Sequence, residues 1–299
     1  MKNIFSSISL FLIIPIMLFN LRAQEALPYI LDTVGRVVFC TLLPCGVLVR
    51  LFITSPAARY LSFFLSKTPL WRASGLSASF APGIIAGTLA GFPMGAIAVS
   101  SDKSKSAPKA LALSSIASPA FLAAVLPTPL EGIFLYTILV LSLWCILLPI
   151  PCPKCRANPP PRHTVSFAEA LSEGASSAVG VAGAIIFVSV ILALLPDSLS
   201  KTAREFIFAL SEIGTAASFC KNPAALSLAL SFGGLCAWAQ IDFSSKGVDT
   251  GLYLFSRLFL FFPTLLFFLC PKLRIFELIF LILLLVFEIS VINSCKKRK

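Results

Sequence analysis

The chain has 299 residues, of which 58% are hydrophobic and only 12% are charged, and its formal net charge is +11. A soluble domain of this length could not bury so much apolar surface, so the composition predicts a polytopic membrane protein. The Lys and Arg residues lie in short loops and at both ends of the chain, which is typical of the cytoplasmic side of membrane proteins and not of a nucleic-acid-binding face. Nucleic acid is therefore not an expected partner.

The first apolar run, Ile4–Leu21, is preceded by Lys2 and followed by Arg22. A basic residue, an apolar stretch and a small residue near Gln24 could form a cleaved signal peptide, and the same features fit a first membrane span. We expect an uncleaved span, because the run is long and Arg22 makes a poor neighbourhood for cleavage.

Further apolar runs of about 18 residues or more are long enough to cross a hydrocarbon core of about 30 Å. In chain order they are Val34–Thr54, Ala78–Ser100, Ala110–Pro127, Gly132–Ile150, Val179–Pro196, Ala224–Ile241, Gly251–Cys270 and Leu273–Ile292. The run Thr202–Cys220 is less apolar, because it carries an arginine and two glutamates, and its composition predicts an amphipathic, interfacial or re-entrant helix.

Basic residues at both ends, Lys2 and Lys296–Lys299, place both termini in the cytoplasm, so the number of complete crossings should be even. One run should then not cross completely. Ala78–Ser100 is the candidate, because lysines and arginines flank it on both sides and its "GTLAGFPMGAIAVS" combines glycines with a proline. We therefore predict an all-α, polytopic membrane helix bundle of about eight transmembrane helices, in which this run is broken or re-entrant.

A polar, proline-rich connection divides the chain. Residues 151–178 contain "NPPPR", which cannot be helical, followed by Ser166 three residues before Glu169, which is the spacing of a capping box. These features predict a cytoplasmic linker that ends in a short amphipathic helix. Residues 1–150 would then form a first membrane half, and residues 179–299 a second membrane half with a basic C-terminal tail.

The two halves carry similar segments. "ARYLSFFLSKTPLWRASG" precedes the Ala78 run with its "AGFPMGAIA", and "AREFIFALSEIGTAAS" precedes the Ala224 run with its "FGGLCAWAQ". By the predicted topology the halves would be inverted copies, and interrupted segments at matching positions indicate a transporter-like site at the membrane midplane. The alternative is chance similarity between alanine-rich apolar sequences.

Gly91, Pro93 and Gly95 are the first candidate site residues. If the helix is broken there, its freed N–H and C=O groups must face protein, water or a ligand. The alternative is that glycine only allows close packing between helices. Glu212 and Gln240 are further candidates, because polar side chains within a membrane usually face a cavity or a partner. For Glu212 the alternative is a solvent-exposed position at the interface.

Three other groups give weaker signals. Glu277 and Glu288 lie on one face of the last run, where they could line a path, but basic residues nearby favour the prediction that they reach the interface and pair there. Cys152, Cys155 and His163 supply only three of the four ligands that a structural zinc ion needs, so no metal site is expected. The sequence contains no recognisable catalytic motif, so neither an enzyme nor a cofactor is expected.

Several segments occur in a distinctive order: "AGFPMGA", "LSSIASPAFLAAVL", "SFAEALSEGASSAVGVAGAIIFVSVILALL", "LSEIGTAAS", and "LSFGGLCAWAQ" with "YLFSRLFLFF". In this order they resemble the YlbJ-type sporulation integral membrane protein family, one of the families with a nucleoside-recognition or Gate domain. The resemblance covers roughly Pro44 to Phe262. It implies a role in endospore formation and a place in the cell (cytoplasmic) membrane, of the forespore or of the mother cell. The link to nucleosides is an analogy at the level of the fold.

The resemblance extends to the candidate site residues. It implies a substrate-binding role for Gly91, Pro93, Gly95, Glu212, Gly233, Gly234 and Gln240. Two departures matter: the family commonly has a lysine where this chain has Ile97, and paired asparagines where it has Ser115 and Ile116. The polar groups that the family shares are therefore not all present in this chain.

These features together predict a membrane protein of endospore formation that acts as a transporter-like or channel-like element for a small polar solute. Its surroundings are the lipid bilayer, and a homo-oligomer or other sporulation membrane proteins are open as partners. The alternative function is a non-transporting membrane scaffold for the assembly of spore cortex or coat.

Overall fold

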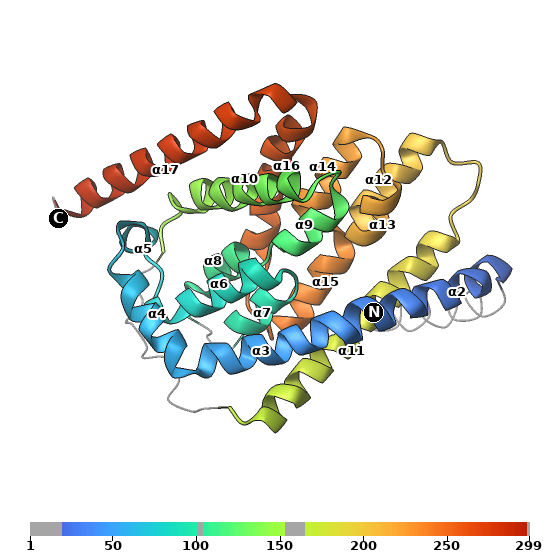
Figure 1. Cartoon of the computed structure of the whole chain (residues 1–299), viewed down its shortest axis with the longest axis horizontal. Helices are drawn as coiled ribbons and strands as arrows, with labels where there is room; N and C mark the ends of the chain where they lie inside the picture. The colour runs from blue at the N-terminus through green and yellow to red at the C-terminus, as the bar shows by residue number, and fades with distance from the viewer. Residues whose placement is uncertain (1–19, 101–103, 153–164, 298–299) are drawn as a thin grey trace, which may run out of the picture.

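The computed structural model describes residues 20–100, 104–152 and 165–297, and within them every regular element is a helix (Figure 1). The predicted all-α class is confirmed. Among the described residues, six helices are long and apolar enough to cross a membrane, and a seventh crossing results if the bent pair Val38–Thr54 and Pro56–Ser66 is one span. The chain is therefore a multi-pass membrane protein. The predicted first run, Ile4–Leu21, lies almost entirely outside the described residues.

Several helices in the first part of the chain begin at a Ser-Pro or Thr-Pro pair. Ser55, Thr68, Ser118 and Thr128 each accept a hydrogen bond from a backbone N–H of the first turn, and the proline that follows each of them has no N–H to leave unpaired. The helices of this part are α2 (Leu21–Val34), η1 (Gly35–Leu42), α3 (Leu43–Thr54), α4 (Pro56–Ser66), α5 (Pro69–Ser74), η2 (Ala78–Phe80), α6 (Ala81–Ala90), α7 (Met94–Val99), α8 (Ala107–Ser114), α9 (Pro119–Val125) and α10 (Pro129–Leu147).

In the second part, the predicted capping box is present: the Ser166 hydroxyl accepts from the Glu169 N–H, and the Glu169 carboxylate accepts from the Ser166 N–H. The helix that starts there continues without a break through Val179, so the predicted short amphipathic helix and the predicted span are one element. It contains no proline, and glycines such as Gly174 pack against neighbouring helices. The helices of this part are α11 (Phe167–Ala193), α12 (Lys201–Ser211), α13 (Ile213–Phe219), α14 (Pro223–Phe232), α15 (Gly234–Ser244), α16 (Gly251–Leu269), η3 (Pro271–Leu273) and α17 (Arg274–Lys297).

Ala78–Ser100 forms a helical hairpin, in which α6 is followed by α7. The chain turns at Gly91, whose φ of +83° favours glycine, and at Pro93, which directly precedes α7. A Cβ atom added at Gly83 would lie 3.1 Å from the Cβ atom of Ala98. The two arms therefore run antiparallel and have their outer ends at the same end of the bundle. The prediction that this run is not an ordinary crossing is confirmed.

Helices α12 and α13 form a second hairpin, with its turn at Glu212. At the base, the Glu205 carboxylate accepts from the Asn222 N–H at 2.9 Å, and the Cys220 thiol donates to the Glu205 carbonyl. The predicted run Thr202–Cys220 is therefore two short helices and not one, and its place relative to the membrane stays a prediction.

A hairpin, a broken helix and a long helix follow one another twice among the described residues. These are α6–α7, α8–α9 and α10 in the first half, and α12–α13, α14–α15 and α16 in the second. Helices α4, α5 and η2 separate α3 from the first hairpin, whereas α11 leads directly to the second. The predicted pairing of the Ala78 run with the Ala224 run is therefore wrong. The chain reverses at Gly91, whereas it continues in one span through Gly233.

The two halves run in opposite directions through the bundle. Arg50, near the end of α3, donates to Glu173, near the start of α11, at 3.0 Å. Ile30 and Val34 of α2 belong to the same apolar cluster as Val190, near the end of α11. Helices α2 and α3 are thus antiparallel to α11 and lie beside it, as Figure 1 shows.

Candidate functional site

The turns of both hairpins meet the interruptions of both broken helices within the described part of the chain. A Cβ atom added at Gly91 would lie 2.9 Å from the backbone N of Ser118, directly before α9. One added at Gly233, between α14 and α15, would lie 3.1 Å from the Phe92 ring, so the first hairpin reaches the second half. We call this meeting point the break cluster. It consists of four segments: Gly91–Pro93, Ser115–Ser118, Ser211–Glu212 and Gly233–Gly234.

Glu212 is the polar side chain at the turn of the second hairpin. A Cβ atom added at Gly234 would lie 2.8 Å from the backbone carbonyl of Ser211, so this turn packs directly on the α14–α15 break. The Glu212 Oε1 accepts from the Gly214 N–H at 2.7 Å, and its Oε2 accepts from the Thr215 N–H. The carboxylate therefore caps the N-terminus of α13, where the helix dipole is positive.

The glycines predicted as site residues have two different environments. Gly91, Gly233 and Gly234 have φ angles of +83°, +83° and +81°, which residues with a Cβ atom rarely adopt, and all three lie in the break cluster. Gly95 lies outside the cluster, on α7, where an added Cβ atom would collide with the carbonyl oxygen of Ser114. For Gly95 the alternative interpretation, close packing between helices, therefore holds.

Gln240 lies on α15, well beyond the break. Its side chain is buried, with 8% exposed, and its Nε2 donates to the Cys236 sulfur at 3.1 Å. Cys236 is on the first turn of the same helix and is 2% exposed. The Gln240 amide is thus engaged within α15, one turn further from the break than Cys236.

Two residues of α16 donate hydrogen bonds to the carbonyls at the C-terminal ends of α8 and α14. The sequence analysis did not single these two residues out. The Tyr253 hydroxyl donates to the carbonyl of Phe232, the last residue of α14, at 3.0 Å. Arg257 donates through Nη2 to the carbonyl of Ala112 in α8, at 2.8 Å, and to that of Ser115 directly after α8. The signal was available, because an arginine inside an apolar run is a functional candidate by default.

The charged side chains in and around the break cluster are opposite in sign to the partial charges of the helix ends that they contact. The C-terminal carbonyls of α8 carry partial negative charge and meet the Arg257 cation. The N-terminus of α13 is positive and meets the Glu212 carboxylate, and the Ser118 hydroxyl caps α9. Backbone groups that a broken helix leaves free are therefore bound here by the chain's own side chains.

No family model, no curated protein and no solved structure matches this chain. The YlbJ-type resemblance therefore remains a prediction. At the positions where the chain departs from that pattern, Ile97 packs in an apolar cluster with Val49 and Met94, and Ile116 is 1% exposed. The hydroxyl of Ser115 is buried and has no hydrogen-bond partner among the described residues. These positions add no charged group to the break cluster.

The predicted interfacial pairing of Glu277 on α17 is wrong. Arg274 pairs with Glu131 of α10 at 2.7 Å and donates to the carbonyl of Phe267. Glu277 is only 8% exposed, and neither of its carboxylate oxygens has a hydrogen-bond partner in the described part of the chain. Arg274 pairs with Glu131 instead of Glu277, because Glu131 lies on the first turn of α10, close to the start of α17.

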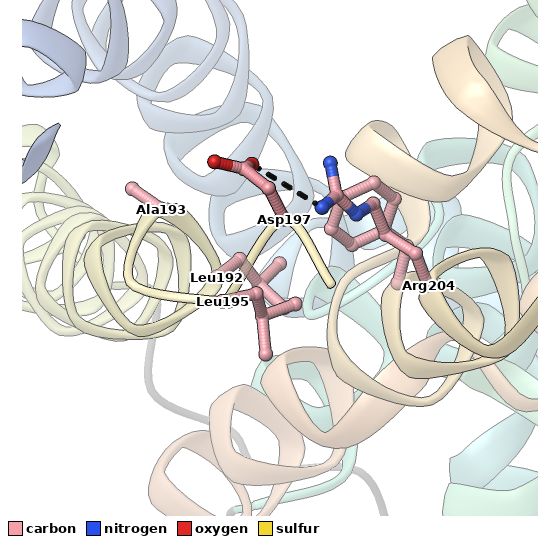
Figure 2. A pocket seen from close by; sticks show the side chains of 6 residues that line it. Leu192, Ala193, Leu195, Asp197 and Arg204 are labelled. Atoms are coloured by element: carbon pink, nitrogen blue, oxygen red, sulfur yellow. Dashed lines mark hydrogen bonds and ion pairs between the residues drawn. The ribbon is translucent and has the colours of Figure 1, made fainter. Parts of the chain in front are cut away.

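Metal binding and cavities do not point to another site. The predicted cysteine and histidine group falls largely on residues 153–164, outside the described residues, and the described residues contain no cluster of three or more His, Cys, Asp or Glu side chains that could hold a metal ion. A cavity of about 250 Å³ lies where α11 meets α12 (Figure 2). Arg204 pairs with Asp197 there at 3.5 Å over apolar side chains, and none of the residues that line the cavity belongs to the break cluster.

Proposed function

We propose that the protein is a transporter-like or channel-like membrane protein for a small polar solute, and that the break cluster is its gate. One observation carries this proposal: the turns of two hairpins, at Phe92 and at Ser211–Glu212, contact the same break at Gly233–Gly234. Paired interrupted segments of this kind, in halves of opposite direction, are the arrangement from which many transporters build a site at the membrane midplane.

The hairpins provide a physical basis for access from two sides. The first hairpin follows α3 to α5, and the second follows the far end of α11, which is antiparallel to α3. Their bases therefore belong to opposite ends of the bundle. Displacement of one hairpin opens the cluster toward one face of the membrane, while the other hairpin keeps it closed toward the opposite face.

The solute class and the biological setting in this proposal come from the YlbJ-type resemblance. It favours a nucleoside-like solute and a role in endospore formation, in the cell membrane of the forespore or the mother cell. The polar groups at the cluster are compatible with an uncharged, hydrogen-bonding solute, because they are backbone groups, hydroxyls, the Glu212 carboxylate and the Arg257 guanidinium, whose charges are opposite in sign. The alternative function is a non-transporting scaffold, and the following test distinguishes it from a transporter-like protein.

Cysteine accessibility at Phe92 tests the gate without knowledge of the solute. In a variant without native cysteines, Phe92→Cys is treated with a membrane-impermeant maleimide in right-side-out and in inside-out vesicles. We expect slow labelling from both faces, because the hairpins open in turn. Leu139→Cys, at a position on α10 that is 0% exposed, is the fully buried control and should stay unlabelled from either face, whereas Phe92 is half-buried.

The opposite result would favour a scaffold. If Phe92→Cys is as unreactive as Leu139→Cys from both faces, the break cluster is permanently closed and the gate proposal fails. In a spore-forming host, normal sporulation with Glu212→Gln, combined with loss of sporulation on removal of Lys296–Lys299, would support the scaffold instead.

A further inference from the structure

Arg257 is a buried cation whose hydrogen-bond partners are carbonyl oxygens. It is 1% exposed, and its Nη2 donates to the carbonyls of Ala112 and Ser115. Its guanidinium carbon lies 4.6 Å from the centre of the Tyr253 ring. No carboxylate pairs with it in the described part of the chain. Its charge is therefore balanced by the end of a helix and the face of an aromatic ring.

The two carbonyls belong to the end of a helix that stops inside the bundle. Ala112 is in the last turn of α8, and Ser115 follows its last residue, so neither position has a following helical turn to donate to its carbonyl. A helix C-terminus carries a charge of about −0.5, and in apolar surroundings its free carbonyls need a donor or a cation. In transporters built from broken helices, such ends coordinate the coupling Na⁺ or proton.

We propose that Arg257 is a tethered cation that takes the place of a diffusible coupling ion at the α8–α9 break. This proposal rests on the transport function proposed above. Tyr253, one turn earlier, supplies the corresponding donor at the end of α14, where it binds the Phe232 carbonyl. Both carbonyl ends are occupied by side chains of one helix, so movement of the solute requires neither Na⁺ nor K⁺.

The charge of Arg257 matters more than its number of hydrogen bonds. Its Nε and Nη1 atoms are buried and have no hydrogen-bond partner among the described residues, so only one of its three nitrogens forms hydrogen bonds. Lys109 also binds two carbonyls, those of Ser74 and Ile150, but it does so near the start of α8, away from the break. Among the described residues, Arg257 is the cation that binds carbonyls at the break itself.

The first test uses the purified full-length protein in detergent, and its unfolding is followed by tryptophan fluorescence. The unfolding temperature is compared in sodium, potassium and choline chloride at equal ionic strength. We expect the three values to agree to within about 1 °C, because a cation that does not bind the folded state cannot stabilise it. A saturable increase with sodium or potassium over choline would overturn the proposal.

The second test removes the tethered cation. Arg257→Ala should lower the unfolding temperature by roughly 5–10 °C, and low millimolar guanidinium chloride should restore at least half of that loss by binding in the vacated position. Arg257→Lys keeps a charge at the position and should lose less than Arg257→Ala. Arg59→Ala, at an exposed position on α4, is the matched control and should show no gain with guanidinium.

Equal responses of Arg257→Ala and Arg59→Ala to guanidinium would assign Arg257 a packing role only. If Arg257→Ala does not fold, Arg257→Lys takes its place: because it keeps the tethered charge it should show no sodium-dependent gain, and a saturable gain with sodium over choline in this variant decides against a tethered cation. These measurements report ion binding to the folded protein, whereas Phe92 labelling reports opening of the gate. The two proposals can therefore fail independently.

Discussion

Glycine has two separate roles near the break cluster, and the backbone distinguishes them. Gly91, Gly233 and Gly234 turn the chain with positive φ angles. Gly95 has an ordinary helical conformation and instead lets α7 approach the end of α8. A substitution at the first three positions acts through the backbone conformation, whereas one at Gly95 acts through a collision with a neighbouring helix.

Gly95→Ala should destabilise the protein by about 1–3 kcal/mol, because its methyl group would meet the Ser114 backbone, which cannot rotate away. The measurement is the unfolding temperature in detergent. Gly183→Ala on α11 is the matched control: its methyl group meets nothing within 4 Å, so helix propensity should make it neutral or up to about 1 kcal/mol stabilising. Equal stability of the two variants would contradict the close packing at Gly95.

The sequence predicted the residues that interrupt helices better than those that hold the interrupted ends. Gly91 and Gly233 stand out because a neighbouring proline or second glycine weakens the helix there, and Glu212 stands out because a carboxylate is rare in an apolar run. Arg257 is equally unusual, yet its partners lie about 145 residues away in the chain, and no spacing rule connects them. Its role became visible only when the fold placed α16 beside α8.

At the scale of elements, flanking charge was a reliable guide and the glycine motifs were not. Lysines and arginines on both sides of Ala78–Ser100 required the chain to return, and it does. "AGFPMGA" and "FGGLCAWAQ" look alike, but only the first reverses the chain, because the direction after a break depends on the packing of both arms. The continuity of α11 was missed for a similar reason: a capping box marks a start and carries no information about length.

A disulfide tests the first hairpin directly. Gly83→Cys combined with Ala98→Cys should cross-link readily under mild oxidation, because the two Cβ positions lie 3.1 Å apart, close to the range of about 3.5–4.5 Å in disulfides. In a straight helix the same positions would be about 22 Å apart. Mass spectrometry of the linked peptides is the measurement, and Gly83→Cys with Ala90→Cys is the control that should remain unlinked.

At the scale of the whole molecule, contacts between distant segments fix the relative direction of the helices. Glu131 pairs with Arg274 where α10 and α17 begin, and Asn293, near the end of α17, donates to the Pro69 carbonyl of α5 at 3.5 Å. Figure 1 shows α17 along α10 on one flank of the bundle. The end of α17 therefore lies at the same end of the bundle as α5 and α4.

This arrangement predicts which positions share a side of the membrane. Cys295, which is exposed near the end of α17, and Phe167→Cys, at the start of α11, should react with an impermeant maleimide from the cytoplasmic face. Ser198→Cys, after the end of α11, should react only from the opposite face. Labelling of Cys295 and Ser198→Cys from one face would contradict the antiparallel arrangement of the two halves.

Helix α16 is hydrogen-bonded to helices of both halves. Tyr253 and Arg257 are one turn apart on a single rigid element, and they hold α14 of the second half and α8 of the first. A rotation or axial shift of α16 would therefore change the hydrogen bonds to both helices together, although no loop joins α8 to α14. In the proposed transporter, the two halves would then move together because one helix holds both, without a signal passed along the chain.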